Sequence, residues 1–386
     1  MITDKMILEC TGCSACVDNC PKKCISMKYD AEGFRIPSVD SSRCINCRIC
    51  EMNCPMNSNV YQKVARNAKA RAYAAFSKNE ETRKASATGG IFYEIARKMI
   101  QENGVVYGAV GSALKGVTHV KAENIDELHA MQGSKYVQSD MQGVYLQVKE
   151  DLKKKKKVLF SGTPCQVAAL YSVIGKDDDN LITMDVICHG VPSEKVLHKF
   201  ISEWEIKKNK KVINYYRDKE MGWKPPRYAF DYEDGSKECF VSTEIPYNRG
   251  FIQNLYIRKV CTHCRFAQIP RISDITVGDW FGGNKSKELD PDNKGLSMVV
   301  GNSAKGQALL DDISDAIFFK EYTIEEAVQE SEHLGKTPKE NILRPIFFKL
   351  NNRYSFLKLA VFLLPTNKVL RVVRKVFIIV LNMGRK

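Results

Sequence analysis

Cysteines are the residues of this 386-residue chain whose type and spacing point most directly to chemistry. Fourteen are present, and nine of them lie within the first 54 residues. Two segments, 10-CTGCSACVDNCP-21 and 44-CINCRICEMNCP-55, repeat the pattern C-x2-C-x2-C-x3-C-P. The N-terminus contains acidic residues and lacks the apolar stretch that directs secretion, so we expect thiols that bind metal rather than disulfides.

The repeated pattern is typical of bacterial ferredoxins with two 4Fe-4S clusters, in which the fourth cysteine of each run binds the cluster of the other run. The predicted ligands of the first cluster are Cys10, Cys13, Cys16 and Cys54. The predicted ligands of the second cluster are Cys44, Cys47, Cys50 and Cys20. Zinc, the alternative metal, favours two separated pairs of ligands, which this spacing does not provide. Cys24 belongs to neither group, and we expect it to pack in the interior.

A third group of cysteines follows predicted strands farther along the chain. The segments 158-VLFSG-162 and 181-LITMDV-186 each predict a buried strand, followed by a turn with one cysteine and then by a helix. Such units in series predict a parallel sheet with right-handed crossovers, with sites beyond the carboxyl ends of its strands. The predicted ligands of a third cluster are Cys165, Cys188, Cys261 and Cys264. A structural zinc or unrelated buried thiols are the alternatives, and Cys239 falls in a predicted hairpin strand outside this group.

A glycine-rich helix start at Thr88-Gly89-Gly90 is a candidate anion site. Apolar residues recur at helical spacing from Ile91 onward, and Asn103-Gly104 ends the predicted helix. Free N–H groups and the helix dipole at such a start favour a phosphate. A plain helix cap is the alternative, and the sequence does not match the GxGxxG pattern of nicotinamide-binding domains.

The formal net charge of +14 comes partly from 153-KKKKK-157 and from a C-terminal region without acidic residues after Glu340. Such a positive charge favours solubility, binding of an acidic partner or contact with a membrane surface. We expect no binding of nucleic acid. In 367-NKVLRVVRKVFIIVLNMGRK-386 basic residues share one helical face, and the apolar run is too short to span a bilayer. We therefore predict a helix lying on an anionic membrane surface, with packing on the body or on a partner chain as the alternative.

Several motifs occur in a fixed order after the cysteine runs: SATGG, GSKYVQS, SGTPCQ, DVICHGVPS, CTHCRF and SDITVGDWFG. With them the chain resembles the coenzyme F-420 hydrogenase/dehydrogenase beta-subunit family over roughly residues 5–335. The resemblance is to the bacterial type with a fused ferredoxin domain that is associated with polysaccharide biosynthesis. It implies an enzyme with FAD that passes electrons between a two-electron reductant and iron–sulfur clusters.

The resemblance also implies which residues bind FAD. These are Ser86, Thr88, Gly89, Gly90, Lys135, Tyr136, Gln138, Ser139 and Asp279. Asp279 would orient a backbone or flavin group, or else cap a turn. No catalytic residue is assigned; His189, beside a predicted ligand, would handle a proton or serve as a structural hydrogen-bond donor.

The expected fold is an α+β ferredoxin-like dicluster head joined to an α/β FAD-binding domain with a parallel sheet, and a helical C-terminal tail. The expected regions are the dicluster domain 1–60, the flavin-binding region 61–155, the α/β region with the third cluster 156–335, and the tail 336–386. We expect a cytoplasmic flavin- and iron–sulfur-dependent oxidoreductase, at the inner membrane face if the tail binds lipid. The alternative is a non-catalytic electron-transfer subunit that docks on another redox enzyme. Expected partners are a ferredoxin or another oxidoreductase, or a second copy of the chain; the sequence does not specify the electron donor or acceptor.

Overall fold

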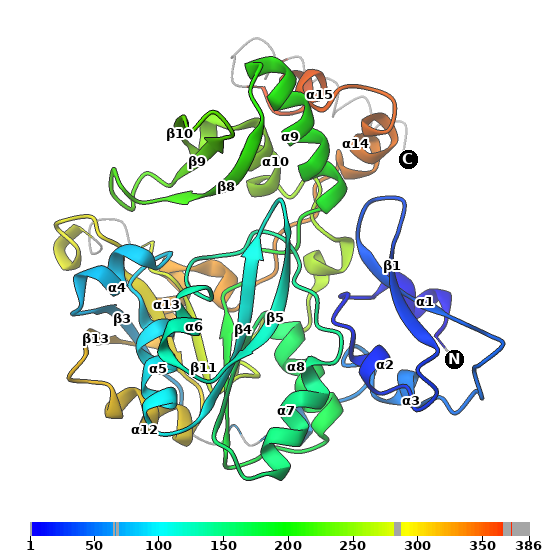
Figure 1. Cartoon of the computed structure of the whole chain (residues 1–386). Helices are drawn as coiled ribbons and strands as arrows, with labels where there is room; N and C mark the ends of the chain where they lie inside the picture. Colours follow the sequence, from blue (N-terminus) through cyan, green and yellow to red (C-terminus); the bar gives the residue numbers. More distant parts are fainter. Residues whose placement is uncertain (1, 65, 67–68, 282–286, 366–371, 373–386) are drawn as a thin grey trace.

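The computed structural model describes residues 2–64, 66, 69–281, 287–365 and 372. A large mixed sheet with helices on both faces forms the body (Figure 1). A smaller sheet with its own helices lies above the body in this view, and the N-terminal head lies at its right-hand side.

The central sheet has eight strands among the described residues, in the order β13-β3-β12-β11-β7-β6-β4-β5. In that order the strands are Ile317–Tyr322, Arg71–Ser77, Ser297–Gly301, Ile275–Asp279, Leu181–Val186, Val158–Gly162, Val105–Ser112 and Gly116–Ala122. The strands β11, β7, β6 and β4 are parallel, which confirms the predicted strand–turn–helix units. The remaining pairings are antiparallel, so the sheet is mixed rather than wholly parallel. At one edge the reason is local, because the three residues between β4 and β5 are too few for a parallel crossover.

Helices cover both faces of this sheet because alternate strand residues point to opposite sides. Val158 and Phe160 pack with helices α7 (Val144–Lys153) and α8 (Pro164–Ile174), whereas Leu159 packs on the other face. That other face carries α5 (Ile91–Gln101), α6 (Ile125–His129) and α12 (Ala304–Asp312). Helix α4 (Glu80–Ala85) lies beside β3, and α13 (Ile324–Glu330) joins a further apolar cluster at that end of the sheet.

The ranges 61–155 and 156–335, which we expected to be separate regions, share this sheet. Strands β3, β4 and β5 come from the first range, and their neighbours β12, β13 and β6 come from the second. The backbone hydrogen bonds of β4 with β6, and of β3 with β12 and β13, therefore join the two ranges in one folding unit.

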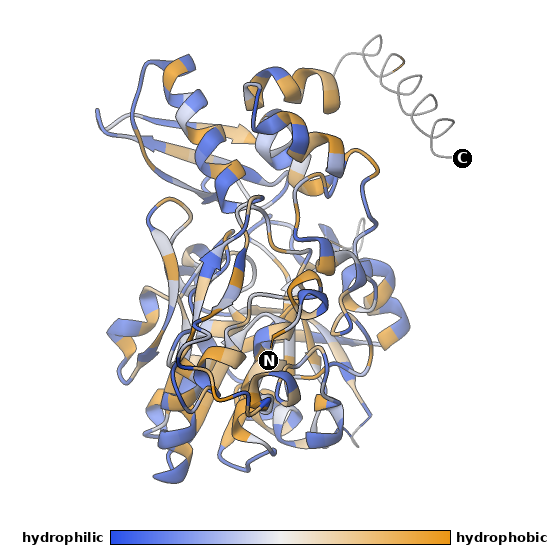
Figure 2. Cartoon of the chain, turned by 90° about the vertical axis from the view of Figure 1, so that its right-hand side faces the viewer, coloured by the Kyte–Doolittle hydropathy of each residue, from blue (hydrophilic) through white to orange (hydrophobic). Residues whose placement is uncertain are grey.

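The smaller unit contains an antiparallel sheet in the order β10-β9-β8. Its strands are Lys237–Val241, Arg227–Tyr232 and Val212–Asp218, and its helices are α9 (Glu194–Lys208), α10 (Pro246–Ile252), α14 (Arg344–Asn351) and α15 (Phe356–Leu363). Helix α15 is apolar along most of its length (Figure 2), and Phe356 and Leu363 are buried with Phe200 in one core. This stretch of the range predicted as a helical tail is helical, and its apolar residues complete that core, so it packs on the body.

The rest of the predicted tail, 366–386, lies outside the described residues except for Val372. Among the described helices, none has the length and apolar character needed to cross a membrane.

The head contains two short strands, β1 (Ile25–Tyr29) and β2 (Arg35–Val39), which pair antiparallel between the two cysteine runs as predicted. Its helices are short: α1 (Asp4–Leu8), α2 (Ala15–Asp18) and α3 (Ile49–Met52), followed by a 3-10 turn, η1 (Val60–Lys63). Ala15 and Val60 are buried together with residues of α7 and α8, so the head packs directly on one face of the body.

Candidate functional site

The two cysteine runs of the head fold into loops with the same backbone pattern. Gly12 and Ser14 have φ values of 71° and 65° in the first run, and Asn46 and Arg48 have values of 53° and 60° at the equivalent positions of the second run. Left-handed residues in such a loop turn successive backbone N–H groups inward, and concavities of this kind bind anions and iron–sulfur clusters. The backbone around both runs therefore fits an anionic cluster.

The thiols predicted to hold the first cluster lie together in the head. Burial is the first cause that raises the pKa of Cys13, and the neighbouring Cys54, Cys10 and Cys16 raise it further. Cys54 comes from the second run, as the interleaved ferredoxin pattern requires. Four thiols close enough to affect one another in this way are a donor set that fits a cubane.

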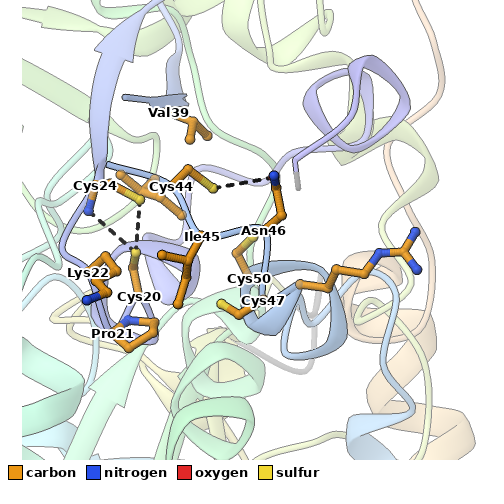
Figure 3. Close-up of a pocket in the computed structure, with 12 residues that line it drawn as sticks. Cys20, Pro21, Lys22, Cys24, Val39, Cys44, Ile45, Asn46, Cys47 and Cys50 are labelled. Atoms are coloured by element: carbon orange, nitrogen blue, oxygen red, sulfur yellow. Dashed lines mark hydrogen bonds between the residues drawn. The ribbon is translucent and has the colours of Figure 1, made fainter. Parts of the chain in front are cut away.

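The thiols predicted to hold the second cluster line one pocket (Figure 3). Cys20, Cys44, Cys47 and Cys50 all line it, and the side chain of Cys47 is exposed to solvent. Cys24 also lines this pocket, with its sulfur 3.4 Å from that of Cys20. Cys24 is buried as predicted, but it packs against a proposed ligand rather than in an apolar core.

The third group forms at the edge of the central sheet, where we predicted it. Cys165 follows β6 in the first turn of α8, and Cys188 follows the neighbouring strand β7. Cys261 lies in the 3-10 turn η3 (Lys259–His263), and Cys264 follows that turn. Burial raises the pKa of Cys165 to about 12 and that of Cys261 to about 11, and Cys264 raises both. Cys239 lies on β10 opposite Ala229, away from this group.

Across the described ranges, no three His, Cys, Asp or Glu side chains are arranged to hold a single metal ion. A 4Fe-4S cluster binds one thiolate at each of four irons, so its ligands stand farther apart than those of one ion. The first and third groups are therefore recognised by the burial of their thiols and the effects of these thiols on one another, and the second group by the pocket that its thiols line.

The first and third thiol groups face each other across the packing of head and body. Tyr145 of α7 donates a hydrogen bond to the carbonyl of Cys13 at 2.8 Å, and the nearby thiol of Cys165 is among the groups that raise the pKa of Tyr145, after burial and Cys13. Cys165 and Cys264 pack against the apolar cluster that contains Cys13. Cys50 of the second group is among the groups that raise the pKa of Cys54 of the first, after burial and Cys10. The three groups thus form a series from the sheet edge, through the first group, to the second group with its exposed Cys47.

The predicted anion loop lies on strand β3. Gly89 donates its N–H to the hydroxyl of Ser297 at 2.9 Å, and Thr88 shares a hydrogen bond of 2.8 Å with the same hydroxyl. Gly90 has a φ of 88° and immediately precedes α5, as the sequence predicted. A side chain on Gly89 would come within 2.5 Å of the Ala75 carbonyl oxygen, so only glycine lets the loop lie this close to the strand.

Lys219, which follows β8 in the smaller unit, holds this loop through hydrogen bonds. The sequence did not predict this role. Its ammonium group donates to the carbonyls of Arg83, Ser86 and Thr88 at 2.7–2.9 Å. Burial, followed by the charges of Arg217 and Arg83, lowers the pKa of Lys219 to about 7. Ser86 itself donates its hydroxyl to the carbonyl of Thr82.

Arg217 of β8 is a second basic residue that sequence reasoning missed. It forms an ion pair of 2.8 Å with Asp279, while its Nε and Nη2 atoms are buried without a hydrogen-bond partner among the described residues. Tyr136 packs against Tyr228 with ring centroids 5.3 Å apart, and both rings add to the electrostatic environment of Arg217. Buried N–H groups without acceptors fit a site for an anionic or carbonyl-bearing ligand. Asp279 is therefore the partner of a buried cation rather than the cap of a turn.

The candidate flavin residues and the third thiol group share one sheet edge. In the parallel pair β11/β7, Val277 lies opposite Val186. Asp279, the last residue of β11, and Cys188 each lie two residues beyond that pair, and so lie at the same end of the sheet.

Three predicted residues have other contacts. Gln138 donates to the carbonyls of Thr11 and Gly12 and accepts from Arg258, so it joins head to body. Ser139 is buried and accepts a hydrogen bond from Gln166. Lys135 donates to the carbonyls of Ala130, Gln132 and Gly133, and burial lowers its pKa to about 8.

His189 uses both ring nitrogens inside the protein. Its Nδ1 lies 2.9 Å from Nε2 of His333, and its Nε2 lies 3.3 Å from the carbonyl of Phe251. Burial, with His333 as the next cause, lowers the pKa of His189. These contacts favour the structural interpretation of His189 over proton transfer.

Comparisons with known proteins identify two regions of the chain. Residues 155–327 match the family of the C-terminal part of the coenzyme F420 hydrogenase/dehydrogenase beta subunit. The matched region thus includes all four thiols of the third group. In front of it, residues 9–58 match the 4Fe-4S dicluster domain, which covers both cysteine runs.

Among solved structures, this protein is similar to a chain of the F420-reducing NiFe hydrogenase complex from Methanosarcina barkeri. The two chains are 18% identical, the match covers 76% of this chain and 90% of the other, and the TM-score is 0.45. Comparison with the curated proteins gives no match.

Proposed function

We propose that this chain is an oxidoreductase that relays electrons between FAD at the β7/β11 edge and three 4Fe-4S clusters. The observation that carries the proposal is the serial arrangement of the three thiol groups, which leads from the sheet edge to the exposed Cys47. The dicluster domain and the beta-subunit family support an electron-transfer role for the two halves of this path.

In this proposal each thiol group holds one cluster as its thiolates. The buried first group lies between the other two and would pass electrons between them. The third group lies beside the candidate flavin residues, and the second group reaches the surface, where a redox partner protein would exchange single electrons. Tyr145 would keep the first group against α7 through its bond to Cys13.

The residues proposed to hold FAD come from both units of the body. Arg217 would direct its buried Nε and Nη2 groups to the ligand, while Asp279 fixes its orientation. Lys219 would hold the Thr88-Gly89-Gly90 loop and place a positive charge behind it. When bound, FAD would exchange a hydride with a two-electron partner and exchange electrons one at a time with the clusters.

A second candidate function is favoured by the name of the family, whose members are described as beta subunits. In that case the chain would be an electron-transfer subunit that acts only when docked on another redox enzyme. Isolation of the chain from its native host distinguishes the two. Turnover of the purified chain with an artificial acceptor supports the enzyme, whereas reduction that requires a stably bound second protein supports the subunit.

The ligand assignment is tested by cofactor analysis after anaerobic purification. We expect about twelve irons and one flavin per chain, because each cubane contains four irons. Cys165→Ala should lower the iron content by about four while two cluster signals persist in electron paramagnetic resonance, because the ferredoxin thiols do not depend on Cys165.

Cys239→Ala is the matched control, because Cys239 lies on β10 outside all three groups. It should leave iron and flavin unchanged. A content of about eight irons and one zinc would refute the third cluster, and greater damage from Cys239→Ala than from Cys165→Ala would refute the assignment of its ligands.

A further inference from the structure

Arg258 is a buried cation between the first and third thiol groups. It precedes the turn η3, which carries Cys261, and its backbone N–H donates to the carbonyl of Val191 at 2.8 Å. Its side chain extends toward the head, and the residue is only 4% exposed. The sequence gives no sign of this burial, because Arg258 stands beside Lys259 and basic residues are ordinarily exposed.

Within the described part of the chain, the hydrogen-bond acceptors of Arg258 are all neutral. Its Nη1 donates to the carbonyls of Cys10 and Arg35 at 3.1 Å each, and its Nη2 donates to Gln138 at 2.7 Å. Its Nε is buried without a partner there, and the guanidinium lies 5.0 Å from the ring centre of Phe34. Among the ion pairs of the described residues, none includes Arg258, in contrast to the buried Arg271, which pairs with Asp185.

A buried charge without a counter-charge is costly, so a compensating negative charge is expected nearby. The thiols around Arg258 can supply it. Its Nη1 donates to the carbonyl of Cys10, which belongs to the first group, and its own carbonyl accepts the N–H of Cys261, which belongs to the third, at 3.0 Å. Four thiolates leave a 4Fe-4S cluster anionic, and each electron that it accepts adds negative charge.

We infer that Arg258 is the shared counter-cation of the first and third clusters. Its positive charge lies near both clusters and raises both of their reduction potentials. The inference rests on the proposed function, because it requires a cluster at each group. Net charge near a cluster is one of the factors that set its potential. A cation shared by two neighbouring clusters favours reduction at both, so the electron is not trapped on one side of the contact between head and body.

The inference is tested with Arg258→Gln in the full, cluster-loaded chain. Potentiometric titration followed by electron paramagnetic resonance should show lower potentials for two of the three clusters. We expect each of these two to become at least tenfold harder to reduce, which is about 59 mV for one electron. The second cluster is the internal control, because none of the hydrogen bonds that Arg258 makes with the described residues reaches that group, and its potential should stay unchanged.

Arg258→Lys separates charge from shape, because lysine keeps the positive charge but lacks the fork of donors. It should restore most of both potentials. If Arg258→Gln loses iron at the first and third sites while Arg258→Lys retains it, the charge is needed to assemble both clusters, which also supports the inference. Unchanged potentials, a shift at only one cluster, or equal iron loss in both variants would overturn it. A wild-type chain without three clusters would instead refute the proposed function.

Discussion

At the scale of single residues, buried basic side chains differ in whether an acid accompanies them. Arg83 pairs with Asp290 at 2.7 Å, whereas Lys219 beside it donates to carbonyl groups. A lysine held by neutral acceptors in a buried place loses its proton more readily. Lys219 is therefore the residue through which pH should affect the proposed flavin site.

We predict that FAD binding to the flavin-free protein weakens as pH rises above about 7. In the flavin-free protein Lys219 has a pKa of about 7. Burial, Arg217 and Arg83 lower this pKa more than Asp290 and Asp279 raise it. An anionic ligand would raise this pKa, so binding takes up a proton between the two values and affinity falls as pH increases. Fluorescence titration should show a loss on the order of tenfold for each unit by which binding raises the pKa.

Lys219→Arg is the matched control for this prediction. Arginine keeps its charge throughout this pH range, so the affinity of the variant should be nearly independent of pH. A wild-type profile as flat as that of Lys219→Arg would contradict the role of Lys219.

The sequence was most informative for residues whose spacing itself is the signal. The three thiol groups follow from local intervals and from the strand ends, and the structure brings each group together. Arg217, Lys219 and Arg258 could not be recognised, because an arginine or lysine in a sequence is ordinarily a surface residue. For Gln138, whose position in a motif suggested FAD, the sequence did not reveal the hydrogen bonds that join it to the head.

At the scale of elements, the predicted strand–turn–helix units were found because each is local in sequence. The antiparallel strands β12 and β13 were not predicted, since their pairing with β3 joins residues more than two hundred positions apart. This pairing is important for the candidate site. It places Ser297, the first residue of β12, under the Thr88-Gly89-Gly90 loop, where its hydroxyl fixes Gly89.

We predict that Gly89→Ala lowers flavin content while it leaves the clusters of the head intact. The added carbon would lie 2.5 Å from the Ala75 carbonyl and 2.8 Å from the Ser297 hydroxyl, so the loop must leave the strand. Overpacking of this kind costs about 1–3 kcal/mol of unfolding free energy. Flavin absorbance and thermal unfolding measure the two effects.

Gly235→Ala provides the comparison for backbone strain alone. Gly235 has a φ of 80°, with open space where a side chain would lie, so its replacement costs roughly 1 kcal/mol without a steric clash. It should retain flavin. Normal flavin content in Gly89→Ala would place the cofactor away from this loop.

At the scale of the whole molecule, the head, the body and the C-terminal helices meet at Arg344. This residue of α14 donates from Nε to the carbonyl of Ile257 at 2.9 Å, next to Arg258. Its other nitrogens bind Glu32 in the head at 3.2 and 2.5 Å, and its guanidinium lies 4.6 Å from the ring centre of Phe348. The stretch that sequence composition assigned to a tail therefore stabilises the contact on which the proposed relay depends.

We predict that Arg344→Met loosens the head from the body without releasing flavin. The substitution leaves Glu32 and the Ile257 carbonyl without their donor. Loss of this ion pair should lower the unfolding free energy by about 2 kcal/mol, because Arg344 is buried while the side chain of Glu32 is 33% exposed. Amide hydrogen exchange over residues 1–60 should become faster. A double-mutant cycle with Glu32→Gln should give a coupling of about 1 kcal/mol, because the two residues form one ion pair. If exchange accelerates equally in the central sheet, Arg344 stabilises the whole fold rather than the attachment of the head.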